Sequence, residues 1–332
     1  MGFDTVFTDG VLVDIDVHTW TGERQLKPED LGLTEKDVSK AFRLGSKTLI
    51  PAEIMSQFKH LDYESRKLLT EKGFSFPFGG ARFIPKSTMI DFADGMGNLI
   101  EKFNAVVEDL ISNYDKYKLQ MREHYVYAAN EAYEKVQSKG YDKTKDEYIN
   151  EFLSRVDSFY PSAEDIRKRF GMEYHVFQVA LPDLSEASYD DIATESQKMR
   201  LLEDSYKKSL YRKINEFTEN IVKELRAKAE TVIRKVRDNI KEEGRVTERT
   251  LKMIRRMIQN YESMNIVGDS VLVGQLKEFK TKYLDGVPAV KYRTDKDFRL
   301  EIGDALERLL ATATDQVAID TLISNYKQKV QV

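Results

Sequence analysis

Two long stretches of the chain, Ser87 to Lys139 and Tyr189 to Glu243, carry apolar residues at steady helical spacing and contain no proline. Each stretch is several times longer than the mean globular helix of about 11–12 residues. At about 1.5 Å per residue, each would form a helix roughly 80 Å long. The pattern therefore predicts two long helices as the main feature of the architecture.

The apolar stripe of the second stretch has a period slightly longer than that of an ideal helix. It covers 41 residues in eleven steps, or about 3.7 residues per turn. This period favours a straight or weakly right-handed stripe over a left-handed heptad coil. The members of the stripe are Met199, Leu202, Tyr206, Leu210, Ile214, Phe217, Ile221, Leu225, Ala229, Val232, Val236 and Ile240.

The stripe of the first stretch changes its period partway along. It keeps heptad steps from Met89 to Leu110 and drifts to a longer period from Tyr114 to Val136. We expect the two helices to form an antiparallel pair within one chain, because the segment between them is long enough to reverse the chain direction. A homodimeric coiled coil is the alternative, since an apolar stripe does not identify its partner.

Two short segments have strand character. Val11 to Val17 alternates apolar and polar residues, and Tyr174 to Leu181 is rich in β-forming residues and ends at Pro182. We expect these segments to pair in a small sheet. Further helices are predicted at 34–42, 51–72, 143–159, 161–170, 247–264, 270–283 and 295–329.

The predicted fold class is mainly α. An elongated antiparallel pair of long helices would form a coiled-coil-like arm, accompanied by a small α+β head and a C-terminal helical segment. The predicted parts are the head at 1–86, the first long helix at 87–139, a helical connector with a short strand at 140–188, the second long helix at 189–243 and the C-terminal helices at 244–332.

Composition is consistent with long helices that keep much of their surface in water, because 33% of the residues are charged and 41% are hydrophobic. No apolar run approaches the roughly 18 residues of a membrane span, and the first residues lack the pattern of a secretion signal. We therefore expect a soluble, cytoplasmic protein. The absence of cysteine excludes disulfides, thiolate metal sites and a cysteine nucleophile.

The net charge of −4 conceals a separation of charge along the chain. Residues 198–256 contain eighteen Lys and Arg against ten Asp and Glu, a local charge of +8, which leaves −12 for the other residues. A basic helix face of this kind attracts phosphate groups. A nucleic-acid site on this segment would use Lys207, Lys208, Arg212, Lys213, Arg234, Lys235, Arg237, Arg255 and Arg256.

A simpler interpretation is that the basic helix contacts acidic groups of its own chain. Glu224 with Lys228 and Glu230 with Arg234 have the i, i+4 spacing of such pairs. The tyrosines lie on the apolar stripes and are not interleaved with the basic residues, as a stacking surface for bases would require. Self-pairing is therefore the interpretation that we favour.

Candidate chemistry is sparse. Asp14, Asp16 and His18 fall two residues apart on a predicted strand, so that one face of the strand would present three potential ligands for a divalent cation. The alternative is the solvent-exposed side of a half-buried strand whose other side carries Val13, Ile15 and Val17. We find no other arrangement typical of catalysis and expect no cofactor, so the sequence favours a protein without enzymatic activity.

Several short pieces of the sequence occur together along the chain. They are Trp20-Thr21-Gly22-Glu23-Arg24-Gln25-Leu26, Leu44-Gly45-Ser46-Lys47, Phe76 with Gly79-Gly80 and Ile84-Pro85, Tyr114 in the first long helix, and Pro161 with Arg169-Phe170. In these pieces the chain resembles the uncharacterised phage and bacterial domain-of-unknown-function family thirty-one fifty. The resemblance implies a largely helical fold, a phage setting with a location in the host cytoplasm, and genes for MoxR-type AAA+ ATPases nearby. It implies no functional residues.

The main hypothesis is a non-enzymatic scaffold or adaptor that contacts another protein, with a AAA+ ATPase as the partner that the resemblance suggests. Nucleic-acid binding along the basic segment is the alternative, and an enzyme with a metal at Asp14, Asp16 and His18 is a third hypothesis. The sequence leaves open whether the protein forms homo-oligomers.

Overall fold

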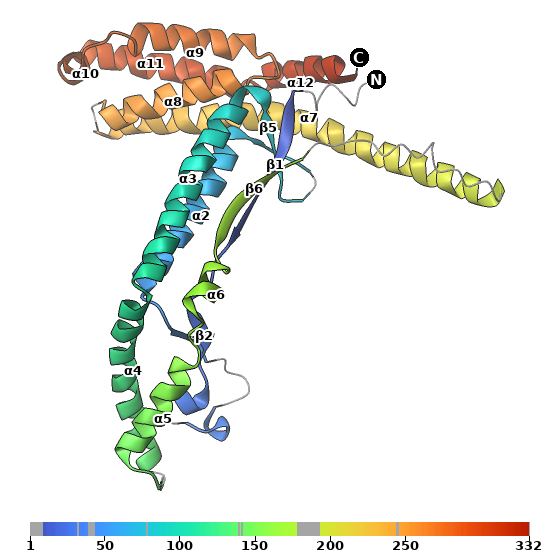
Figure 1. Ribbon diagram of the computed structural model, residues 1–332. Helices are drawn as coiled ribbons and strands as arrows, with labels where there is room; N and C mark the ends of the chain where they lie inside the picture. The colour runs from blue at the N-terminus through green and yellow to red at the C-terminus, as the bar shows by residue number, and fades with distance from the viewer. Residues whose placement is uncertain are drawn as a thin grey trace. The chain divides into compact units, whose positions relative to one another are not determined.

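A computed structural model describes residues 9–31, 33–38, 44–77, 79–138, 140, 142–177, 193–243 and 246–331. The described part is mainly helical with a small sheet region (Figure 1). The chain divides into two compact units, a first unit of residues 1–14, 67–94 and 175–332 and a second unit of residues 15–66 and 95–174. The division falls within strands β1 (Gly10–His18) and β6 (Gly171–Phe177) and helices α2 (Ala52–Lys72) and α3 (Lys86–Ser112).

The main sheet has the strand order β4–β5–β1–β6, with β4 at Phe74–Ser75 and β5 at Arg82–Pro85. Strand β5 is antiparallel to both β1 and β4, and Gly10 lies opposite Pro85. The alternating pattern of β1 is confirmed from Val13 onward, since Val13 and Ile15 are buried and Asp16 and His18 are exposed, whereas Leu12 is buried beside Val13. The predicted second strand is also confirmed as a neighbour of β1, although it begins at Gly171 and its predicted end, 178–181, lies outside the described residues.

The second long stretch, predicted at 189–243, folds into one helix, α7 (Ala193–Glu243), and its first four residues, 189–192, lie outside the described residues. Its apolar stripe is buried from Ile214 to Ile240 except at Val232, which is half-buried. In the first unit α7 packs against α8 (Glu248–Met264), α11 (Lys296–Ala313) and α12 (Gln316–Gln331) (Figure 1). Because helices lie along more than one side of α7, the buried surface is wider than one stripe and also includes Val222 and Ile233.

The first long stretch is not one helix, which corrects the prediction. It consists of α3 and α4 (Tyr114–Gln137), separated by Asn113, whose backbone leaves the helical region at φ −103° and ψ 11°. The break coincides with the change of period in the apolar stripe. Tyr114, the first residue of α4, is buried and donates a hydrogen bond of 3.0 Å to the carbonyl of Pro161.

An antiparallel pairing of the two long stretches is not confirmed. In the second unit α4 packs against α5 (Lys145–Asp157), whereas α7 packs mainly against α8, α11, α12 and β4 within the first unit. The helices that cover each apolar stripe therefore could not be identified from the spacing of the stripe. The five-part organisation along the sequence stays a prediction.

The C-terminal helices follow the predicted boundaries closely. Helix α8 begins after Thr247, whose hydroxyl accepts the Thr250 amide, and α9 (Ser270–Tyr283) begins after Asp269. A short helix, α10 (Ala289–Thr294), precedes α11. The predicted last helix is wrong in one respect, because it ends at Ala313 and resumes as α12 at Gln316. None of the described helices is long and apolar enough to cross a bilayer.

The second unit contains a two-stranded sheet of β2 (Glu23–Gln25) and β3 (Ser46–Thr48), the short helices η1 (Pro28–Leu31), η2 (Glu35–Asp37) and α6 (Ala163–Arg167), and parts of α2 and α3. Its core includes the rings of Phe58, Phe103 and Phe170, with Phe58 centred 4.5 Å from Phe170 and 5.2 Å from Phe103. Helix α2 agrees with the helix predicted at 51–72. Of the helix predicted at 34–42, the structure shows only the short helix η2, and residues 39–42 lie outside the described residues.

Candidate functional site

A groove of about 670 Å³ lies on the first unit between the C-terminal turns of α2, the second half of α7, and α8. Its volume is within the range of about 300–1,000 Å³ that is typical of ligand sites. Among the residues that the structure describes, six basic side chains line it, and Glu71 is the one lining carboxylate. The basic residues are Lys67, Lys228, Lys235, Arg249, Lys252 and Arg256.

Two helices supply the apolar floor of the groove. Leu225, Ala229 and Val232 follow one another on α7 at i, i+4 and i+7, so they share one face of the helix. On α8, Met253 and Met257 are spaced i and i+4 and also share one face of their helix. Leu225, Ala229 and Met257 are buried, while Val232 and Met253 are half-buried and offer apolar surface to the groove.

A buried polar network fixes α7 and α8 beneath the groove. Asp269, which is fully buried, accepts hydrogen bonds of 2.6 Å from Arg226 Nε on α7 and from the Tyr261 hydroxyl on α8. Arg226 also donates to the carbonyl of Thr312. Burial and the nearby Asp269 carboxylate raise the pKa of Tyr261, so the phenol stays a donor. The floor is therefore preorganised by charge-assisted hydrogen bonds.

Lys228 connects α7 to the end of α2. Its ammonium group donates to the carbonyls of Thr70 and Gly73, each at 2.7 Å, and lies 3.6 Å from Glu224. It therefore satisfies carbonyls that the end of a helix leaves without an intrahelical partner. Burial lowers the pKa of Lys228 to about 8, against the opposing effect of Glu224.

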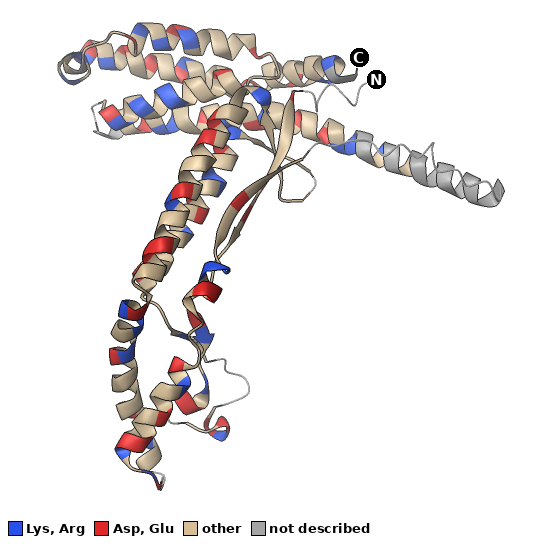
Figure 2. Ribbon diagram, viewed as in Figure 1, with Lys and Arg blue, Asp and Glu red and all other residues tan. Residues whose placement is uncertain are grey.

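Several basic side chains at the outer rim of the groove, unlike Lys228, form no ion pair with a described residue. We call these the open charges. Arg256 pairs with Glu71 across the groove. Lys235, Arg249 and Lys252 are exposed and form no ion pair with any residue that the structure describes. Figure 2 shows the concentration of basic positions along α8. The rim thus presents positive charge that the described part of the chain does not neutralise.

Most of the nine residues predicted to contact nucleic acid have partners within the chain. Lys213 lies 3.0 Å from Glu216, Arg234 lies 2.7 Å from Glu230, and Arg237 contacts Asp238 at 2.7 Å. The predicted pairs of Glu224 with Lys228 and Glu230 with Arg234 are confirmed. This self-pairing agrees with the simpler interpretation of the basic segment.

The other predicted residues whose side chains the structure describes lie in the groove, near Leu284 or on the exposed face of α7. Lys235 and Arg256 line the groove, and Arg255 donates to the carbonyl of Leu284 at 2.9 Å. Lys208 and Arg212 are exposed on α7, where Arg212 lies 4.0 Å from Glu216, and the side chain of Lys207 lies outside the described part. Sequence reasoning missed Lys67, Arg249 and Lys252 as members of one site. The i, i+3, i+7 spacing of Arg249, Lys252 and Arg256 was a signal for a shared helix face, but nothing in the sequence places Lys67 beside them.

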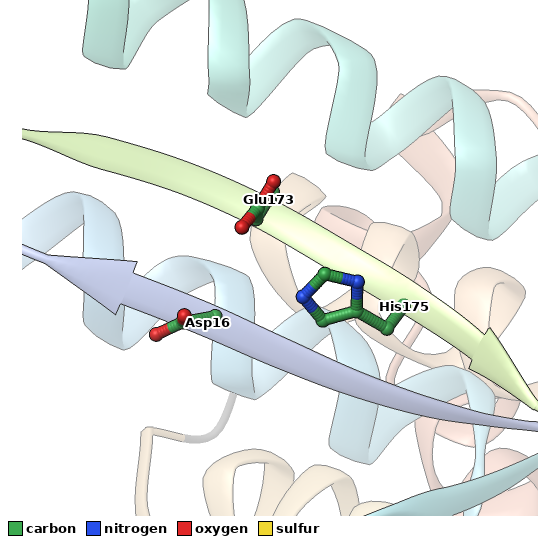
Figure 3. Close-up of side chains that lie close together, drawn as sticks. All are labelled: Asp16, Glu173 and His175. Atoms are coloured by element: carbon green, nitrogen blue, oxygen red, sulfur yellow. The ribbon is translucent and has the colours of Figure 1, made fainter.

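The predicted metal ligands Asp14, Asp16 and His18 all lie on β1, but the structure does not group them. Within the second unit Asp16 lies near Glu173 of β6, with their carboxylate oxygens within 4.8 Å, and Figure 3 shows this pair with His175 farther along β6. The division between the units falls between Tyr174 and His175. Asp16 and Glu173 are both exposed, and exposed carboxylates of this kind are common without a metal.

His18 has a different environment, because its ring lies directly against the backbone of Gly171. A Cβ atom at Gly171 would be 2.3 Å from Cε1 of His18. Glycine at this position therefore allows the ring to pack on the neighbouring strand.

Comparison with known proteins gives one match. A family model described as "Protein of unknown function (DUF3150)" matches residues 8–299. No curated protein and no solved structure matches the chain.

Proposed function

We propose that the chain, which belongs to the family described as "Protein of unknown function (DUF3150)", is a non-enzymatic scaffold or adaptor that binds another protein. The groove between α2, α7 and α8 carries this proposal. It combines apolar surface at Val232 and Met253 with open positive charge at the rim. Such a combination suits a protein segment that brings apolar side chains and negative charge together.

Nucleic acid is the second candidate ligand, since Lys235 and Arg256 of the predicted set do line the groove. Two features of the groove favour protein over nucleic acid. Glu71 lies among the lining residues and would repel phosphate. Tyr261 is the lining aromatic residue, and it is buried with its hydroxyl bonded to Asp269, so it offers no ring for base stacking.

The first partner to test is a MoxR-type AAA+ ATPase, because the family resemblance suggests such genes nearby. In this proposal the protein is phage-encoded and acts in the host cytoplasm. The partner would bind in the groove, and the protein would bring it to other components without catalysing a reaction itself.

Affinity purification with chemical cross-linking and mass spectrometry tests the proposal on the full chain. The variant K235E/R249E/K252E reverses the rim charges, and K277E/R293E/K296E makes the same change in charge at exposed positions outside the groove. We expect a defined protein that wild type and the control variant retain and the rim variant loses.

The purified candidate partner should then bind wild type directly. Recovery of nucleic acid alone, with affinity that falls steeply as salt rises and with no protein enriched over a tag-only control, would replace the proposal by the nucleic-acid alternative.

A further inference from the structure

We infer that the ligand of the groove is an acidic amphipathic α-helix of a partner protein, whose apolar face contacts Val232 and Met253 and whose carboxylates contact Lys235, Arg249 and Lys252. This inference rests on the proposed function and specifies the chemistry of its partner. Three observations support it: the shape of the floor, the position of the open charges, and the fixed framework below them.

The floor has the dimensions of a short helix. The apolar residues that line it on α8 extend from Met253 to Met264, about 16 Å at 1.5 Å per residue, or roughly three helical turns. Met253 is half-buried, whereas Met257 and Met264 are buried at the base. An incoming helix would present apolar residues at i, i+4 and i+7 along this length. Met253 suits such a surface because its flexible, polarisable side chain adapts to differently shaped neighbours.

The open charges lie on both helices that border the floor. Arg249 and Lys252 belong to α8 and Lys235 to α7, and each lines the groove. A helix bound between them would meet positive charge on both of its flanks, so acidic residues on either side of its apolar face match the site. Because these three side chains have no ion pair with a described residue, binding would break no such pair.

The cost of ordering the site is small because its framework is fixed before binding. Arg226, Tyr261 and Asp269 connect α7, α8 and the start of α9 by buried hydrogen bonds of 2.6 Å. Lys228 connects α7 to the end of α2. A preorganised groove loses less conformational entropy when its ligand binds.

A designed peptide provides the probe, with binding measured by fluorescence anisotropy on the full-length protein. The peptide has about 20 residues, a helix of about 30 Å, with leucine at i, i+4, i+7 and i+11 and mainly glutamate elsewhere. Two control peptides accompany it. One replaces glutamate by lysine, and the other keeps the composition but scrambles the order so that no apolar face forms.

We expect the acidic amphipathic peptide to bind and both control peptides to bind at least about tenfold more weakly. K235E/R249E/K252E should weaken binding about tenfold, because three rim charges reverse, whereas K277E/R293E/K296E should change it less than about twofold. Met253→Glu should also weaken binding without altering the rim. Circular dichroism melts of each variant show whether the fold is retained.

Equal binding of the scrambled peptide would overturn the inference, because charge alone would then explain the interaction. Tighter binding of a DNA duplex, lost in the same rim variant, would also overturn it. If a cellular protein depends on the rim residues but no acidic peptide binds, the inference fails while the proposed function stands. If the peptide binds as expected but no protein partner is found, the groove inference stands and the proposed scaffold role fails.

Discussion

Each of the two units contains a buried aspartate that pairs with a buried cation, but the two pairs have different settings. In the first unit Asp269 pairs with Arg226 at 2.6 Å, and both side chains are at most 2% exposed. In the second unit Asp30 pairs with Lys47 at 2.7 Å, and both are at most 4% exposed. The first pair connects the long helix α7 to the N-cap of α9, whereas the second connects the short elements η1 and β3.

The two aspartates differ in which structural elements they hold together. Asp269 accepts bonds from two helices and also from the Leu272 amide at the start of α9, so several elements lose a partner if it is removed. Asp30 accepts from the Lys47 ammonium and the Lys27 amide, and Arg155 lies 3.6 Å away. Because the groove lies over α7 and α8, its geometry depends on the first pair.

The largest expected effect is that of Asp269→Ala, which leaves the Arg226 guanidinium buried without its partner. Breaking a buried pair in this way lowers the free energy of unfolding by about 3–5 kcal/mol. Urea unfolding measures the loss. Glu230→Ala removes the partner of Arg234, 49% exposed, and should change stability by less than about 1 kcal/mol. Equal losses in the two variants would contradict a special role for Asp269.

Asp30→Ala should have a smaller effect, about 3 kcal/mol, at the lower end of the range for broken buried pairs. The flexible chain of Lys47 allows its ammonium group to move toward water, an escape that the enclosed Arg226 lacks. Hydrogen exchange followed by mass spectrometry should show the loss of protection within residues 15–66 and 95–174, the second unit. Loss confined to residues 193–243 would contradict this expectation.

Two buried tyrosines give a matched comparison within the first unit. The Tyr261 hydroxyl bonds to Asp269, whereas the Tyr326 hydroxyl has no hydrogen-bond partner among the described residues. Tyr261→Phe should lower the free energy of unfolding by about 1.5–3 kcal/mol, the value of a bond to a charged group. Tyr326→Phe should leave stability unchanged or raise it. The denaturant midpoints of both variants measure these changes. A large loss of stability in Tyr326→Phe would mean that the Tyr326 hydroxyl has a hydrogen-bond partner.

Lys228 should give stability a pH dependence of known sign. Its pKa is about 8 in the folded protein and 10.5 in the unfolded chain, so the unfolded state binds more protons between these values. The contribution of Lys228 to the free energy of unfolding therefore increases as pH rises from about 8 to 10.5. Urea titrations of wild type and Lys228→Met at several pH values in this window measure the difference. A difference that shrinks with rising pH would contradict the lowered pKa.

The smallest expected effect on stability is that of the exposed rim. K235E/R249E/K252E should shift the free energy of unfolding by less than about 1 kcal/mol, because the three side chains form no ion pair with a described residue. A large loss of stability measured in the same urea experiment would indicate that these residues support the fold.

Local patterns in the sequence were sufficient for most helix boundaries of the first unit. Thr247 precedes α8 and Asp269 precedes α9 as N-caps, and Gly73 follows the end of α2. Capping residues and apolar spacing act within a few residues, so the sequence alone displays them. The break at Asn113 had a weaker signal, a change of period that is also compatible with one continuous helix.

The groove belongs to a different class of feature. Arg249 and Lys252 share a face of α8 that can be inferred from their spacing, but Lys67 joins them only because the chain brings α2 beside α7 and α8. The buried pair of Arg226 and Asp269 joins residues that are 43 positions apart. No local pattern connects residues at such separations.

The sequence by itself determined the helical character of the protein, the long helix α7, the strand at β1 and the excess of positive charge at 198–256, because periodicity, capping and charge are properties of neighbouring residues. Tertiary structure alone decided which helices cover α7, which basic residues pair within the chain and which remain open around the groove. These outcomes depend on contacts between segments that are distant in the sequence. A charge buried by such contacts is costly unless it is paired, whereas an exposed charge is solvated by water.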